Sequence, residues 1–127
     1  MKVVIDTNVL VSALLKPYSK PASVLNKVIA GQVTPCFDAR IINEYREVLL
    51  RKKFGFDPAL VEILLRFLEK NGIFVTPHPI DASLPDPYDL PFYEAAVSAS
   101  AVIITGNKKH FPVDDVEVLL PDEFLRR

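Results

Sequence analysis

Cysteine, long apolar runs and surplus charge are all scarce in this chain of 127 residues. The single Cys36 cannot form an internal disulfide, and we interpret it as a small buried residue in a reducing compartment. A nucleophilic thiol would need a nearby cation or helix start, and the sequence places neither beside it. No apolar run approaches the roughly twenty residues that span a bilayer. Met1 leads directly into a predicted strand rather than into a signal peptide, so we expect a cytoplasmic protein without membrane association.

The formal net charge is only -1, so the chain has no surplus of cations with which to hold nucleic acid over a broad surface. A polyanionic partner would have to be bound by a local basic patch or through bound metal. The composition, 50% hydrophobic and 24% charged, is typical of a globular protein with a sizeable core. We expect one domain over residues 1–127, without internal repeats.

The opening of the chain is its most informative stretch. Residues 3–5 predict a strand buried on both faces, and residues 9–15 predict a helix packed back onto it. Between them stand Asp6, Thr7 and Asn8, at the end of the strand where open α/β sheets bind ligands. Two interpretations are open. Asp6 and Thr7 cap the following helix, or Asp6 binds a divalent cation that compensates its charge.

Strands and helices alternate along the rest of the chain. Short β-branched and aromatic runs predict strands over 33–37, 73–75, 102–104 and 116–120. Periodic apolar positions predict helices over 22–30, 39–53, 58–71, from about 91, and over 121–125. Two of these helices form a helical hairpin over about 38–71. The alternation predicts a three-layer α/β/α sandwich with a mostly parallel central sheet of about five strands.

Two acids of the 39–53 helix differ in position. Glu47 lies nearly opposite the apolar stripe, where it can pair with Arg51 as a solvated charge. Glu44 lies on the flank of the stripe and points toward the edge of the core, where it can converge with other acids. A local ion pair between Glu44 and Arg40 is the alternative.

The segment from Thr76 to Pro91 is rich in proline and aspartate, and so long a connection tends to be functional. Asp89 stands at or beside the N-cap of the following helix, so either capping or ligation explains it. Asp86 is interpreted as a turn residue. Glu94 is interpreted as a first-turn charge favoured by the helix dipole rather than as a further acid of a metal site.

A second strand-to-helix turn follows the strand over 102–104. Its polar residues are Thr105, Asn107, Lys108 and Lys109. Their hydroxyl, amide and ammonium groups suit a site that holds phosphate, and a solvated turn is the alternative. His110 is interpreted as a half-buried structural histidine, since the sequence places no orienting acid beside it; a general base is the alternative.

Four of these polar side chains are expected to converge. Asp6 and Asn107 each follow a buried strand, and Asp89 and Glu44 reach the same edge of the sheet if their helices pack there. Three carboxylates and an amide, without a Cys or His cluster, suit Mg²⁺ or Mn²⁺ rather than zinc. Such an ion activates water and neutralises a phosphodiester during in-line attack. These residues predict hydrolysis of a phosphate ester.

Four motifs occur in a fixed order. They are Val-Val-Ile-Asp-Thr-Asn-Val-Leu at 3–10, Glu44 on a mid-chain helix, Asp-Pro-Tyr-Asp-Leu-Pro-Phe at 86–92, and Ile-Ile-Thr-Gly-Asn-Lys-Lys-His-Phe-Pro at 103–112. In this order and at this length, they resemble the PIN domain family. More narrowly, they resemble the toxin components of prokaryotic type II toxin–antitoxin systems. The resemblance covers essentially the whole chain.

The resemblance implies a metal-dependent ribonuclease in which Asp6, Glu44 and Asp89 match three acids of the family's quartet and hold Mg²⁺ or Mn²⁺. Thr7 or Asn8 would support the first acid, and Thr105 is a further supporting residue. The fourth position, commonly Asp, is Asn107 here, so the site would carry one negative charge fewer. We therefore expect a second ion to bind less well, and activity to be weak or to use one metal. The resemblance also implies a homodimer and a cognate antitoxin.

The leading hypothesis is an endoribonuclease acting on single-stranded RNA or a structured RNA loop. Lys108, Lys109, Lys16 and Arg40 are the expected phosphate contacts. The alternative is a catalytically weak or inactive binding module that acts through a protein partner or RNA. A phosphatase or deoxynuclease would share the metal chemistry and differ in substrate.

Overall fold

A parallel sheet forms the centre of the protein in a computed structural model that describes residues 1–127. Its five strands lie in the order β3-β2-β1-β4-β5, and every neighbouring pair is parallel. The strands are β1 (Lys2–Ile5), β2 (Thr34–Phe37), β3 (Ile73–Phe74), β4 (Val102–Ile104) and β5 (Val118–Leu119). The predicted fold class is confirmed.

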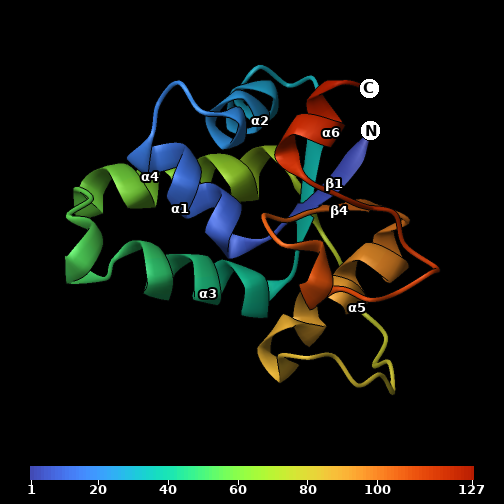
Figure 1. The fold of residues 1–127 in the computed structure, drawn as a ribbon. Coiled ribbons are helices and arrows are strands. Elements are labelled where there is room, and N and C mark those ends of the chain that lie inside the picture. Colours follow the sequence, from blue (N-terminus) through green and yellow to red (C-terminus); the bar gives the residue numbers. More distant parts are fainter.

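Six helices cover this sheet: α1 (Thr7–Leu15), α2 (Lys20–Ile29), α3 (Ala39–Leu49), α4 (Pro58–Asn71), α5 (Leu90–Ala99) and α6 (Pro121–Leu125). Figure 1 shows α5 on one side of the strands and α1, α2 and α4 on the other. Three short 3-10 turns, η1 (Lys52–Phe54), η2 (Pro87–Asp89) and η3 (Lys108–His110), interrupt the connections. None of the helices is both long and apolar enough to cross a membrane.

The hydrophobic core is one cluster of 33 buried residues built around β1. Val3 and Val4 are fully buried, as expected for a central strand covered on both faces. Ala95 and Ala96 of α5 are also fully buried. Because their side chains are small, α5 can pack closely on the sheet, where it contacts β1, β2 and β4.

The helical hairpin has a longer connection than the sequence predicts. The helix predicted over 39–53 ends at Leu49, and η1 follows it. The apolar stripe that packs on the core ends at Leu49, so the exposed residues 51–53 have no apolar contact to prolong the helix. Gly55 then adopts a φ of +69°, which turns the chain toward α4. Arg46 bridges the two helices through Glu62, with Nε 2.9 Å from Oε1.

The strand order places a crevice beside β1. From β1 the chain crosses to β2 on one side, whereas β4 lies on the other, so the connections diverge between β1 and β4. Such a switch point is where open α/β sheets bind ligands, outside the carboxyl ends of the strands. The amide of Asp6 donates to the carbonyl of Ile104 at 2.9 Å, which joins the two strand ends.

Gly72 offers a test of this packing, because a side chain there would collide with β2. A Cβ would lie 2.5 Å from Cε1 of Phe37 and 2.6 Å from the carbonyl oxygen of Pro35. We expect Gly72→Ala to lower the free energy of unfolding by about 1–3 kcal/mol, measured by urea denaturation. Gly106→Ala is the matched control, since a Cβ there meets no atom within 4 Å. Equal midpoints for the two variants would contradict the close approach.

Candidate functional site

A polar pocket of about 410 Å³ opens at the carboxyl edge of the sheet. Eleven residues line it, of which only two are hydrophobic: Asp6, Thr7, Asn8, Glu44, Glu47, Val48, Arg51, Asp86, Tyr88, Asp89 and His110. Five of the lining side chains are carboxylates. They come from the start of α1, from one face of α3, and from η2. The three acids that the sequence expects to converge therefore line one pocket.

Asp6 lies at the end of β1 and is only 4% exposed. Its Oδ2 accepts a hydrogen bond from the hydroxyl of Thr105, which follows β4, at 2.7 Å. Burial raises the pKa of Asp6, and the Thr105 hydrogen bond opposes that rise. Asp6 occupies the N-cap position of α1, but its side chain makes no capping hydrogen bond. The capping interpretation is therefore wrong for Asp6.

Glu44 projects from α3 toward the same pocket. Its carboxylate accepts a hydrogen bond from the hydroxyl of Thr7. Burial raises the pKa of Glu44 most, and the carboxylates of Asp6 and Asp86 raise it further, against the effect of the Thr7 hydroxyl. The next residue, Tyr45, donates its hydroxyl to the carbonyl of Ile5 at 2.5 Å, which fixes α3 to the end of β1.

Asp89 carries the clearest electrostatic strain of the pocket. Its Oδ2 is buried and has no hydrogen-bond partner. Burial raises the pKa of Asp89 to about 6, and the carboxylates of Asp6 and Asp86 contribute further. Asp89 is the N-cap residue of α5, but its side chain makes no capping hydrogen bond. Capping therefore does not explain this side chain, and its buried oxygen is left without a hydrogen bond.

Three pocket residues were given other interpretations from the sequence. Glu47 pairs with Arg51 as predicted and is 62% exposed, but it also lines the pocket. Asp86 caps η2 through the amide of Tyr88, as a turn residue would, but it also lines the pocket. Asp86 and Asp89 are three residues apart, which places both acids on the same side of one turn. This spacing is the feature of the sequence from which the pocket position of Asp86 could have been predicted.

His110 has an acid beside it after all, because its Nδ1 lies 3.6 Å from Asp89 Oδ2. That contact joins η3 to η2, and no local sequence pattern could have predicted it.

Arg40 does not pair with Glu44, so the alternative of a local ion pair is wrong. Its guanidinium instead contacts Asp38 Oδ2 at 2.6 Å and Glu94 Oε1 at 2.8 Å. Glu94 is 4% exposed and also accepts the amide of Ile80 at 2.8 Å. The interpretation of Glu94 as a first-turn dipole charge is therefore wrong, because α5 begins at Leu90 with no acid in its first turn and Glu94 is a buried ion-pair partner. It lies outside the pocket, as that interpretation required.

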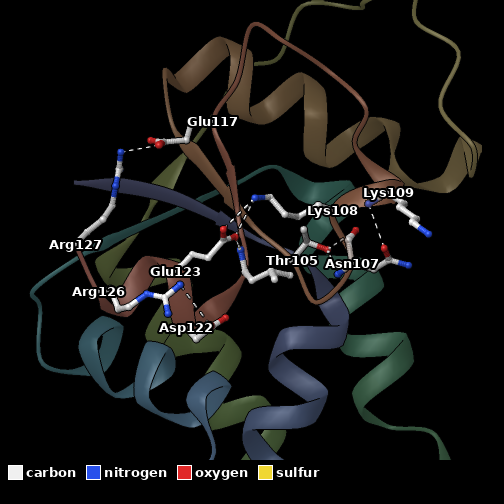
Figure 2. Close-up of polar contacts among 10 residues, drawn as sticks. Thr105, Asn107, Lys108, Lys109, Glu117, Asp122, Glu123, Arg126 and Arg127 are labelled. Carbon is white, nitrogen blue, oxygen red and sulfur yellow. Dashed lines mark hydrogen bonds and ion pairs between the residues drawn. The ribbon is translucent and has the colours of Figure 1, made fainter.

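Asn107 lies at the expected edge of the sheet, but its side chain does not line the pocket. Figure 2 shows its Oδ1 accepting the amide of Lys109, so that it caps η3. The same view shows the Nζ of Lys108 held by Glu123, 3.0 Å from Oε1. The amide of Asn107 in turn donates to the Thr105 hydroxyl at 3.2 Å. Asn107 thus organises the turn beneath Thr105.

The cations expected to contact phosphate stand in different surroundings. Arg40 and Lys108 are engaged in ion pairs, whereas Lys16 and Lys109 are exposed. None of the four lines the pocket. Arg51 does line the pocket. It lies two residues beyond the end of α3, where its guanidinium pairs with Glu47.

The donor set of this pocket fits a hard divalent cation. Carboxylate oxygens are the ligands that Mg²⁺ and Mn²⁺ prefer, and the buried Oδ2 of Asp89 has no hydrogen bond within the protein and so is available as a ligand. As the side chains stand, no three of them are arranged to hold one ion together. Ligation would require the carboxylates to turn toward a common point within the pocket.

Comparison with known proteins identifies relatives of this chain. A family model described as PIN domain matches residues 2–109. The uncharacterized protein MJ1680 of Methanocaldococcus jannaschii is 27% identical over 134 aligned positions, which cover 95% of this chain and 86% of that protein.

Solved structures share the fold at low sequence identity. VapBC2 from Rickettsia felis, bound to a DNA fragment from its promoter, has a TM-score of 0.62 at 14% identity and covers 94% of this chain and 98% of the matched chain. FitAcB from Neisseria gonorrhoeae has a TM-score of 0.63 at 22% identity, covering 94% and 97%. FitAB bound to the IR36 DNA fragment has a TM-score of 0.65 at 20% identity, covering 94% of each chain.

The raised pKa of Asp89 predicts a pH-dependent stability in the absence of metal. The carboxyl of Asp89 has a pKa of about 6 in the folded state and an ordinary value of 3.8. Between these two values the folded state binds more protons than the unfolded state. The free energy of unfolding therefore falls as pH rises from about 4 to about 6. We expect Asp89→Asn to reduce that loss, with Asp6 and Glu44 still contributing to it, and to stabilise the protein in EDTA at pH 8 by about 1–3 kcal/mol. Thermal melts in EDTA at pH 4 and pH 8 would measure the difference.

Asp122→Asn is the matched control for this comparison. Asp122 lies in an exposed pair with Arg126, 3.6 Å apart, so its replacement should change the free energy of unfolding by less than about 0.5 kcal/mol. If Asp89→Asn melts at the parent's temperature at pH 8, the strain assigned to Asp89 is absent.

Proposed function

Because the chain belongs to the PIN domain family, we propose that it is a metal-dependent endoribonuclease whose active site is this acidic pocket. The observation that carries the proposal is the convergence of five carboxylates on one pocket, with the buried Oδ2 of Asp89 unpartnered. Bringing five carboxylates into one pocket lowers the free energy of unfolding, and a bound cation would offset that loss.

Asp6, Glu44 and Asp89 would hold Mg²⁺ or Mn²⁺, which supplies water activation and neutralises charge on the phosphodiester when bound. The protein's own contribution is orientation. The Thr105 hydroxyl holds Oδ2 of Asp6, and the Thr7 hydroxyl holds the carboxylate of Glu44. These two hydrogen bonds keep both carboxylates facing the pocket before substrate arrives.

The proposal includes the role of a toxin restrained by an antitoxin. The structural relatives VapBC2 and FitAB are two-component complexes by name, which supports a protein partner for this chain. An apolar groove of about 460 Å³ between α1, α2 and α4 also supports it. Leu60 and Ile63 on its rim are 63% and 60% exposed. We propose that an apolar segment of the antitoxin lies in this groove, and that the toxin is a homodimer in the cytoplasm.

Replacement of Asp6 tests the active site. We expect Asp6→Asn to lower RNA cleavage by at least about 100-fold, because the variant loses a charged ligand at the centre of the site. It should also lose the rise in melting temperature that Mn²⁺ gives the parent. Gel-based cleavage of a labelled RNA and thermal melts with and without Mn²⁺ would measure both effects.

Asp122→Asn serves again as the control, since it removes a remote exposed carboxylate from α6 and should cleave at the parent's rate. An Asp6→Asn variant that cuts RNA as fast as the parent would disprove the assignment. Competition between RNA, DNA and a small phosphate ester under one metal condition would separate a ribonuclease from a deoxynuclease or phosphatase.

A second candidate function is favoured by Asn107. This residue brings no charge, and its side chain caps η3 rather than facing the pocket. The chain would then be a binding module that keeps the fold and the apolar groove without productive metal binding. Titration calorimetry decides between the two. No heat of Mn²⁺ binding at millimolar concentration, together with tight binding to the product of a neighbouring gene, would favour the binding module.

A further inference from the structure

An exposed aromatic ring stands on the rim of the acidic pocket. Tyr88 lines the pocket and is 79% exposed. By contrast, Tyr45 and Tyr93 are buried and donate their hydroxyls within the protein. An isolated exposed aromatic needs no explanation by itself, but this one stands between Asp86 and Asp89, two acids of the pocket.

The backbone that carries Tyr88 is well defined. Its amide donates to Asp86 Oδ1 at 2.9 Å, and the amide of Asp89 donates to the carbonyl of Asp86 at 3.0 Å. Pro87 restricts the backbone at the start of this turn. The ring is therefore attached to an ordered turn and exposes its surface to solvent beside the acids, so stacking on it would order few additional groups.

Arg51 also lines the pocket and lies just after the end of α3, at the N-cap of η1. It is the only lysine or arginine among the lining residues. Its Nη2 pairs with Glu47 Oε2 at 2.9 Å, and the two side chains are 47% and 62% exposed. An ion pair this exposed contributes little to stability, so the guanidinium can exchange Glu47 for a phosphate at small cost.

We propose that Tyr88 and Arg51 form a subsite for single-stranded RNA, in which the ring stacks on an unpaired base and the guanidinium pairs with a flanking phosphate. The inference rests on the proposed function and narrows its substrate. Bases inside a duplex are already stacked on one another, so this subsite selects unpaired nucleotides. With a net charge of -1, the chain has little general attraction for RNA, and stacking then supplies a large part of the affinity.

Binding of a labelled single-stranded adenine-rich oligoribonucleotide, followed by fluorescence anisotropy in EDTA, tests the ring. We expect Tyr88→Ala to weaken binding about 5- to 100-fold and to raise KM with a smaller change in kcat under Mn²⁺. The same oligonucleotide annealed to its complement should bind the parent less well, and Tyr88→Ala should lose that preference. A folding defect alone would not change the ratio of single-strand to duplex affinity.

Two further variants sharpen the test of stacking. Tyr88→Trp keeps an aromatic ring and introduces a fluorophore into a chain that has no tryptophan, so its emission should be quenched when RNA binds. Tyr18→Ala is the control, because Tyr18 is fully exposed and does not line the pocket. It should bind RNA with the parent's affinity.

Arg51 is tested through salt dependence. Arg51→Ala should reduce the slope of log affinity against log salt by about 0.7, the loss of one phosphate contact to a single strand. Glu47→Gln should tighten binding, because it releases the guanidinium from its present partner.

The outcomes separate the inference from the function on which it rests. If the parent cleaves RNA while Tyr88→Ala binds single strands as tightly as the parent does, the subsite is disproved and the ribonuclease stands. If Tyr88→Trp emission is unchanged at saturating RNA, stacking is likewise disproved. A parent that neither binds nor cleaves RNA overturns the proposed function and the subsite together.

Discussion

The mutual repulsion of the carboxylates in the pocket is the constraint that the rest of this structure must withstand. Five acidic side chains line one pocket, and burial together with their neighbours raises the pKa of both Glu44 and Asp89. That arrangement opposes folding, and it persists because a core of 33 buried residues holds the strands and helices that carry the acids. The same core that stabilises the fold therefore keeps the pocket negatively charged and suited to a cation.

Arg40, the cation that connects the two helices nearest the acids, stands beside the pocket rather than within it. Arg40 joins Asp38 at the start of α3 to Glu94 on α5, and Glu94 holds the amide of Ile80 in the long loop before η2. This network connects the helix that carries Glu44 with the segment that carries Asp89. It fixes the spacing of the acids without neutralising them, because neither Arg40 nor Glu94 lines the pocket. Arg51, the one lysine or arginine that lines the pocket, pairs with Glu47 at 2.9 Å and with no other acid of the pocket.

Much of this arrangement follows from local sequence, and the remainder does not. Strand β4 and helices α4 and α6 lie where the sequence predicts them, because their apolar patterns end at clear polar or proline boundaries. The meeting of Asp6 and Glu44 was predicted because strand ends share an edge and a helix flank faces it. The Glu94–Arg40 pair was missed because its members are 54 residues apart, and local helix rules favoured a dipole role. Asn107 was predicted at the right edge and within a polar turn, but the 3-10 helix η3 that it caps inside that turn was not predicted.

A negatively charged pocket has a further consequence for its substrate. Without a bound cation the five carboxylates repel a phosphodiester, and Arg51 supplies a single positive group against them. In the function proposed here, the ion therefore serves binding as well as chemistry, since it reduces the repulsion between the carboxylates and the phosphate. Base stacking on Tyr88 carries no charge, so it is the contribution to RNA affinity that this repulsion leaves intact. The exposed ring and the buried acids are in this sense complementary parts of one site.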